Sequence, residues 1–329
     1  MAAPAITPLD TANAIRLYNE NNYQAAIEIL RRAVKERKDD AQAWLHLGIA
    51  FSRVGKSKDA RKAFEQTIKL KPNLPQAYIG MAYVLLDAYN LPEAERYALR
   101  AVGVDSSNAE AHYALGLIVL RRNDAAKALA EAEATLNVSP TFAGALILKA
   151  EAALELFAAA SLARAEKYRA LSQPVPPLSV EEQAPMHRML TGAAESLEKY
   201  LRLAPASPSA ARLREQAETL RWHADAILRN NAPPVYNAAD VTTRAQILSK
   251  PEPRYTDRAR NSGVTGTVRL RMLLSFDGRV RHILVLKGLA GGLTETALDS
   301  ARGIKFTPAT KDGRPVSQFV TIEYNFNIY

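Results

Sequence analysis

The chain has 329 residues, no cysteine and a formal net charge of +9. This length favours two domains, and the lack of cysteine excludes disulfides and thiolate sites but leaves the cellular compartment open. No apolar run approaches the roughly 18 residues of a membrane-spanning helix, and residues 1–10 lack the basic start and apolar core of an intact signal peptide.

Positive charge is concentrated in the C-terminal part of the sequence. From residue 241 on, 14 lysines and arginines stand against 7 acidic residues. A basic domain can bind nucleic acid, but these arginines are dispersed, without interleaved aromatic residues or a recognition helix. We therefore expect no nucleic-acid partner, and a basic surface that faces anionic lipid or an acidic protein.

Most of the first 206 residues repeat one helical pattern, which is clearest from Ala41 to Leu74. Gly48 and Ala60 are small enough to let two antiparallel helices approach, and Phe51 and Phe64 fill the gap to the next pair. The same frame recurs over residues 7–40, 75–108 and 109–142. This pattern resembles the tetratricopeptide repeat with its 34-residue period, and the resemblance implies an all-α solenoid.

A fifth repeat extends from residue 143 to 206, because an insertion of about 31 residues (157–187) interrupts it. Residues 143–171 are predicted to form one long helix, and residues 190–203 the second helix of the repeat. The Pro-rich stretch between them predicts a protruding hairpin, which is either a tolerated surface loop or a docking feature.

The solenoid is expected to occupy residues 1–229. A closing helix over residues 209–229 would cover the last repeat, as solenoids require. Residues 230–240 are short and contain proline, which is typical of a semi-rigid linker. The second domain is expected over residues 241–329.

The first helix of each repeat lines the concave groove of such a solenoid. The predicted groove residues are Leu45, Ile49, Arg53, Tyr83, Tyr113, Leu117 and Arg121. This lining is mainly apolar and aromatic, and it lacks the carboxylate clamp of related adaptors that bind acidic tails. The groove either binds a protein or peptide or only packs repeat against repeat, and the linker or the second domain could also fill it.

The second domain begins with a predicted hairpin. Residues 264–276 are apolar at alternate positions, and Asp277-Gly278 is a strong turn signal before a second strand over residues 280–287. The apolar period breaks after Val280, which predicts a bulge at Arg281-His282.

A helix and a long strand follow the hairpin. Thr294 is the predicted N-cap of the helix, and Ala297, Leu298 and Ala301 form its inner face. The last strand alternates from Val316 to Ile328. The fold class is therefore α+β: an all-α solenoid followed by a short helix, a β-hairpin, a helix and a long strand.

This order of elements is accompanied by five short motifs. They are Pro253, Tyr255, Ala259 and Arg260; Gly263–Val268; Asp277–Val280; Lys305–Ala309; and Asp312–Val316. Together they resemble the C-terminal domain of the TonB energy-transducer family. The resemblance implies a periplasmic domain with a three-stranded antiparallel sheet, which binds a short peptide of an outer-membrane transporter by strand addition. The membrane helix and long Pro-rich spacer of TonB proteins are not present in this sequence.

Two surfaces of this domain are candidates for binding. If the last strand lies at the sheet edge, its backbone can pair with a partner strand. The side chains expected to contact that strand are Ser317, Phe319, Thr321, Glu323 and Asn325. The apolar residues Leu273, Leu284 and Leu286, beside Arg269 and Arg271, form a second patch that needs cover from the repeats or from a second copy; we favour the domain interface.

No catalytic constellation is found. The five histidines (His46, His112, His187, His223 and His282) show no i, i+4 pair with a carboxylate, so no zinc site is predicted. Gly288–Gly292 precedes a helix but lacks the remainder of a phosphate-binding motif, and no Gly-x-Ser-x-Gly motif occurs. We expect no cofactor, no metal and no catalytic residue.

The favoured interpretation is a non-enzymatic adaptor of the bacterial cell envelope, in which the repeats and the C-terminal domain bind different proteins. The alternative is a repeat scaffold whose C-terminal domain is only an intramolecular module or a dimerisation module. A second alternative is an enzyme with a site between the domains.

Overall fold

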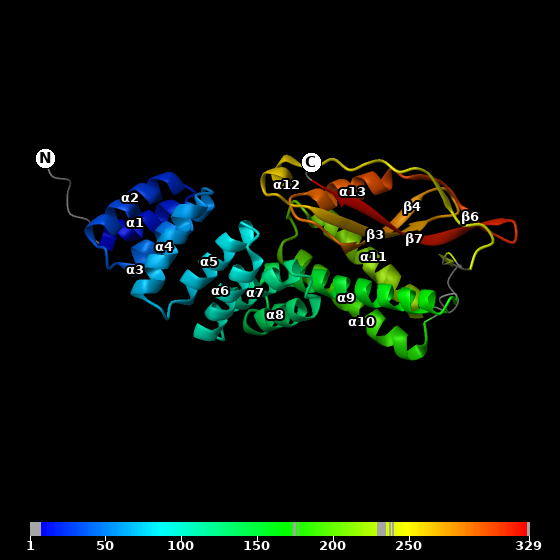
Figure 1. Ribbon diagram of the computed structural model, residues 1–329, viewed down its shortest axis with the longest axis horizontal. Coiled ribbons are helices and arrows are strands. Elements are labelled where there is room, and N and C mark those ends of the chain that lie inside the picture. The colour runs from blue at the N-terminus through cyan, green and yellow to red at the C-terminus, as the bar shows by residue number, and fades with distance from the viewer. Residues whose placement is uncertain are drawn as a thin grey trace. The chain divides into compact units, whose positions relative to one another are not determined.

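The computed structural model describes residues 8–173, 176, 178–228, 235–236, 238 and 240–327. Contacts within the chain divide it into two compact units, residues 1–145 and 146–329 (Figure 1). An N-terminal helical repeat region and a C-terminal strand-rich region follow one another, so the predicted α+β class is confirmed.

The first unit consists of helices that pack in consecutive pairs. Their bounds are α1 Pro8–Asn19, α2 Tyr23–Glu36, α3 Ala41–Arg53, α4 Ser57–Leu70, α5 Pro75–Asp87, α6 Leu91–Val104, α7 Ala109–Arg121 and α8 Ala125–Val138. Asp40, Asn108 and Asp124 are N-caps whose side chains accept a backbone N–H three residues on. Such caps satisfy amides that have no partner within the helix, so polar residues set where the repeat helices begin.

The ring of Phe64 holds two neighbouring repeats together. It is 1% exposed and lies against glycines of both flanking helices. A Cβ atom added at Gly48 in α3 would lie 2.7 Å from the ring, and one added at Gly80 in α5 would lie 2.4 Å from it. Both glycines therefore make room for the same ring.

The fifth repeat is formed by α9, Ala143–Ala170, and α10, Val180–Leu203. The predicted start of the second helix at residue 190 is wrong, because the helix begins ten residues earlier. Ser179 and Glu182 form a capping box, a helix-start signal, and the helix continues through Pro185. Residues 174, 175 and 177 of the predicted Pro-rich tip lie outside the described residues.

The closing helix α11 spans Ala210–Leu228 and packs against α10. The predicted linker (230–240) lies largely outside the described residues, but Val235 and Tyr236 within it form strand β1.

The remaining elements form the C-terminal domain. Their bounds are β2 Gln246–Ser249, α12 Asp257–Asn261, β3 Gly266–Leu274, β4 Val280–Lys287, α13 Leu293–Arg302, β5 Lys305–Thr307, β6 Ala309–Lys311 and β7 Arg314–Phe326. The main sheet has the order β1-β7-β3-β4, with β6 also paired to β7, and β2 pairs with β5 in a separate ribbon.

The sheet is larger than the three antiparallel strands that were predicted. Strands β4, β3 and β7 do form an antiparallel core. Strand β1 adds to β7 in parallel at Ser317 and Gln318, and β6 folds back on β7 through the Asp312-Gly313 turn. The prediction was wrong here because β1 and β6 are too short to show a period of two.

Two local predictions have clear outcomes. The bulge is confirmed, since the register shifts between Arg271 and Leu273 while the partner strand advances from Leu284 to Arg281, and His282 within it has a φ of 48°. The predicted cap of α13 is wrong: Gly292 is the N-cap.

Each face of the sheet is covered by helices, α13 on one side and α11 on the other (Figure 1). Ala297 and Ala301 of α13 pack with β3 and with Ile322, Tyr324 and Phe326 of β7. On the other face, Leu284 and Leu286 of β4 belong to the same apolar cluster as α10 and α11. The prediction that the repeat region covers this second patch is confirmed for these two leucines.

Tyr324 offers a test of the α13 side. Its side chain is fully buried, its hydroxyl has no hydrogen-bond partner within the described residues, and burial raises the pKa of the phenol to about 12. A buried polar group without a partner destabilises the fold.

We therefore expect Tyr324→Phe to leave stability unchanged or to raise it by up to about 1 kcal/mol, measured by urea unfolding. Tyr255→Phe is the control, because the Tyr255 hydroxyl donates to the carbonyl of Val264 and its loss should destabilise. A loss in Tyr324→Phe as large as that of the control would contradict the assignment.

Candidate partner-binding surfaces

The outer edge of β7 is the first candidate surface. Strand β3 pairs with β7 from Phe326 back to Gln318 on the inner side. On the opposite side β1 covers only Ser317 and Gln318. From residue 319 to 326, no strand of the described chain pairs with this outer edge. Along this stretch a further strand can add to β7 by pairing with its main-chain groups.

The five predicted edge-strand side chains have different surroundings. Thr321, Glu323 and Asn325 are exposed. Ser317 and Phe319 are half-buried. All five side chains lie on the sheet face opposite α13, because the alternate residues Ile322, Tyr324 and Phe326 are in the α13 core.

The three exposed residues of this set lie beside β3. Asn325 accepts a hydrogen bond from Thr267 at 2.8 Å, and Arg269 donates to the Glu323 carboxylate at 2.7 Å. Thr321 is opposite Arg271 in the register. These contacts make a polar surface that a partner strand would meet from the side.

Phe319 instead takes part in an aromatic cluster with α11. Its ring lies 5.1 Å from that of His223 in a stacked arrangement and 5.7 Å from Trp222. Trp222 stacks on His282 at 4.3 Å with an interplanar angle of 6°. The Arg271 guanidinium lies 4.5 Å from the centre of the Phe319 ring. We call Trp222, His223, His282, Phe319 and Arg271 the aromatic cluster.

Burial lowers the pKa values of the two histidines in the aromatic cluster. His223 is 3% exposed, and burial, followed by the charge of Arg271, lowers its pKa to about 3. Its Nε2 lies 3.2 Å from the carbonyl oxygen of His282. Burial also lowers the pKa of the His282 imidazole, and Arg281 adds to this. The His223 imidazole is therefore neutral when α11 is packed on the sheet.

The aromatic cluster was missed at the sequence level, although the apolar patch beside it was predicted. Trp222 and His223 lie in the segment predicted as a closing helix, and no periodicity shows which surface that helix covers. Two ion pairs join α11 to α13: Arg212 pairs with Glu295, and Arg302 with Glu215 at 3.0 Å. The opposite charges on α11 and α13 are a sequence signal for the proximity of the two helices. This signal is weak, because exposed charge pairs contribute little.

The repeat groove is the second candidate surface, and its predicted residues differ in exposure. Leu45 is buried; Ile49, Tyr83, Tyr113 and Leu117 are half-buried; Arg53 and Arg121 are exposed.

Packing explains part of this set. The Tyr113 ring lies 4.8 Å from that of Phe142, tilted by 45°, and it leaves no space for a Cβ atom at Gly144. Leu45 is 4% exposed, so both residues serve packing within the helical region. The half-exposed residues that can contact a ligand are Ile49, Tyr83 and Leu117.

Polar contacts lie beside them. The Tyr83 hydroxyl donates to Glu110 at 2.6 Å, and burial together with this carboxylate raises the pKa of Tyr83. Arg53 donates to the Tyr18 hydroxyl at 2.9 Å. The predicted groove residues therefore combine half-exposed apolar side chains with charged groups.

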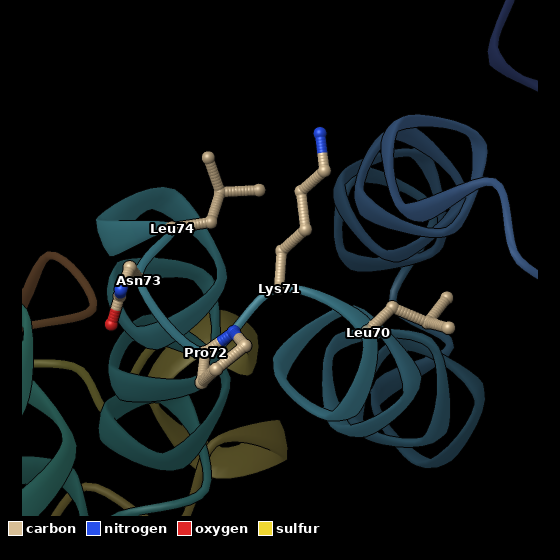
Figure 2. A pocket seen from close by; sticks show the side chains of 5 residues that line it. All are labelled: Leu70, Lys71, Pro72, Asn73 and Leu74. Carbon is tan, nitrogen blue, oxygen red and sulfur yellow. The ribbon is translucent and has the colours of Figure 1, made fainter.

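A depression between α4 and α5 carries no site chemistry. Leu70, Lys71, Pro72, Asn73 and Leu74 line it. Figure 2 shows Lys71 and Leu74 extending to one side and Asn73 pointing to the other. Among the described residues, no group of three or more His, Asp or Glu could hold a metal ion. The described helices include none that is long and apolar enough to cross a membrane.

Comparisons with known families agree with this geometry. The tetratricopeptide repeat model matches residues 11–75, 49–102 and 79–144. The model of the Gram-negative bacterial TonB protein C-terminal domain matches residues 251–328. The chain carries tetratricopeptide repeats and a TonB-type C-terminal domain. Both kinds of module indicate a protein–protein interaction scaffold.

Solved structures of repeat proteins are similar to the chain at low identity. PilW, a type IV pilus biogenesis factor, is 17% identical, with 69% of this chain and 87% of that chain covered and a TM-score of 0.46. TTC0263, a thermophilic repeat protein from Thermus thermophilus, is 18% identical, with 67% and 97% covered and a TM-score of 0.45. TM-scores this low carry no argument about function. No curated protein sequence matches the chain.

Proposed function

We propose that the protein is a non-enzymatic adaptor in the periplasm of a Gram-negative cell envelope. In this proposal the TonB-type domain binds an extended segment of an outer-membrane transporter by strand addition, and the repeats bind a second protein or peptide.

The outer edge of β7 carries the proposal. From residue 319 to 326 it has β3 on one side and no described strand on the other, while the α13 core covers one face of this stretch. This edge is where a further strand can make main-chain hydrogen bonds. Parallel pairing of β1 at Ser317 and Gln318 supports the same direction for an added strand.

The repeats support a second binding site. Ile49, Tyr83 and Leu117 are half-exposed beside charged Arg53 and Glu110, a combination that suits a peptide with apolar anchors and a few polar groups. Arg121, exposed on α7, is a further charged residue that we include in this proposed site.

One observation favours a second candidate function. Helix α11 covers Leu284 and Leu286 of the TonB-type domain, so this domain could be an internal module of a repeat scaffold. In that case the repeats alone would bind partners.

Hydrogen exchange of the full chain separates the two candidates. Synthetic N-terminal segments of outer-membrane transporters are added, and amide exchange is followed by mass spectrometry along the sequence. A proline at the centre of the segment is the control, because it removes a main-chain donor. We expect slower exchange confined to residues 317–327, lost with the proline-containing peptide. Unchanged exchange in β7 with every peptide would reject strand addition.

A further inference from the structure

We propose that Lys250 gates the outer edge of β7, so that a partner strand has to displace its ammonium group before it can pair beyond Gln318. This inference rests on the proposed function, because it concerns the regulation of the same edge.

Lys250 lies on the outer side of β7. Its Nζ donates a hydrogen bond to the main-chain carbonyl of Glu323 at 3.2 Å and lies 4.8 Å from the centre of the Tyr324 ring. A strand that adds along β7 needs main-chain groups of this edge as partners. The Lys250 ammonium therefore occupies an acceptor within the segment from 319 to 326 that has no described strand beside it.

A second contact fixes the other end of the same segment. The Ala245 N–H donates to the side-chain Oε1 of Gln318 at 2.7 Å, and Gln318 is 2% exposed. Residues 245–250 thus run in the same direction as residues 318–323 and are attached to β7 at both ends. We call residues 245–250 the edge segment.

The edge segment does not continue the sheet. Its own main chain pairs with β5 instead, with Gln246 opposite Thr307 and Ile247 opposite Phe306. The two hydrogen bonds that join it to β7 each involve a side chain, that of Gln318 or that of Lys250. Such contacts protect an edge from unwanted pairing, and lysine is a residue that proteins use for this purpose.

The gate can open without unfolding the domain. Lys250 is exposed, so its ammonium can return to water at little cost, whereas Gln318 is buried at the end already covered by β1. Displacement is therefore expected at Lys250, with the Ala245–Gln318 contact kept. This order gives an added strand a fixed starting point next to β1.

The test compares the full chain with two variants. Lys250→Ala removes the gate, and Lys305→Ala removes an equally charged, exposed lysine of β5. The probe is the transporter segment that gives the largest exchange protection, labelled with a fluorophore and titrated by anisotropy. We expect Lys250→Ala to bind about threefold to tenfold more tightly and Lys305→Ala to bind like the parent chain.

Each result has a defined meaning. Equal affinities of the parent chain and Lys250→Ala, with strand addition present in both, would overturn the gate and leave the proposed function intact. Tighter binding of Lys305→Ala to the same extent would also overturn it, since net charge would then explain the change. Failure of all three proteins to bind any segment would reject strand addition, and the gate with it. Lys250→Gln, which keeps a long side chain without the charge, is expected to lie between the parent chain and Lys250→Ala.

Discussion

Phe64→Ala is expected to destabilise the N-terminal unit by about 3–5 kcal/mol, the usual cost of removing a buried aromatic ring. The ring fills the space between α3 and α5, where Gly48 and Gly80 face it, so its loss opens a cavity between two repeats. Repeats contact mainly their neighbours, so the loss affects how the second and third repeats hold together. Urea unfolding followed by circular dichroism measures it.

The matched control in the same helix is Leu70→Ala. Leu70 is 37% exposed, and its removal should change stability by no more than about 0.5 kcal/mol. Gly80→Ala adds a direct check, because its Cβ atom would clash with Phe64. It should destabilise the parent chain but cost much less when combined with Phe64→Ala. Additive costs in the double variant would show that the ring and the glycine do not share this space.

Acidification is expected to weaken the packing of α11 on the sheet. The pKa of His223 is lowered to about 3, mainly by burial and next by Arg271, so the folded state keeps the imidazole neutral. An unfolded chain binds the proton below about pH 6.5. Stability is therefore fully present above that pH and falls as the pH drops toward 3, by about 2 kcal/mol between pH 7 and pH 5.

Trp222 reports this change directly, because it lies next to His223 and stacks on His282. A Trp44→Phe background removes the other of the two tryptophans. Arg271, His282 and Phe319 are the groups of the sheet that face His223, and the lowered pKa of His282 acts in the same direction. His223→Gln should show a flatter dependence of unfolding free energy on pH. The same slope in both proteins would assign the acid sensitivity to other groups.

The sequence is most informative where one residue pattern has one structural solution. The alternation along β7 and the turn at Asp277-Gly278 predict the hairpin and the long strand, and the break after Val280 predicts the bulge at His282. Small and large residues at a fixed period predict the repeat helices. In each case local geometry alone determines the element.

Other features depend on contacts between residues distant in sequence. Val235 and Tyr236 form a strand because they pair with the edge of β7. Two residues are too few to show the alternation that would predict a strand. Phe319 was grouped with the edge-strand residues, whereas His223, almost a hundred positions earlier, stacks on its ring. These features can be predicted only when the residues that contact each other across the fold are known.

The docking of α11 separates two boundaries that are usually assumed to coincide. The family match of the TonB-type domain begins at residue 251, whereas the compact unit that contains it begins at residue 146. Leu284 and Leu286 are shared with helices outside the match. The family match and the compact unit are therefore different lengths of chain. Recombination that exchanged this domain at the linker would carry an uncovered apolar face into its new host, so the domain and its preceding helices are expected to be inherited together.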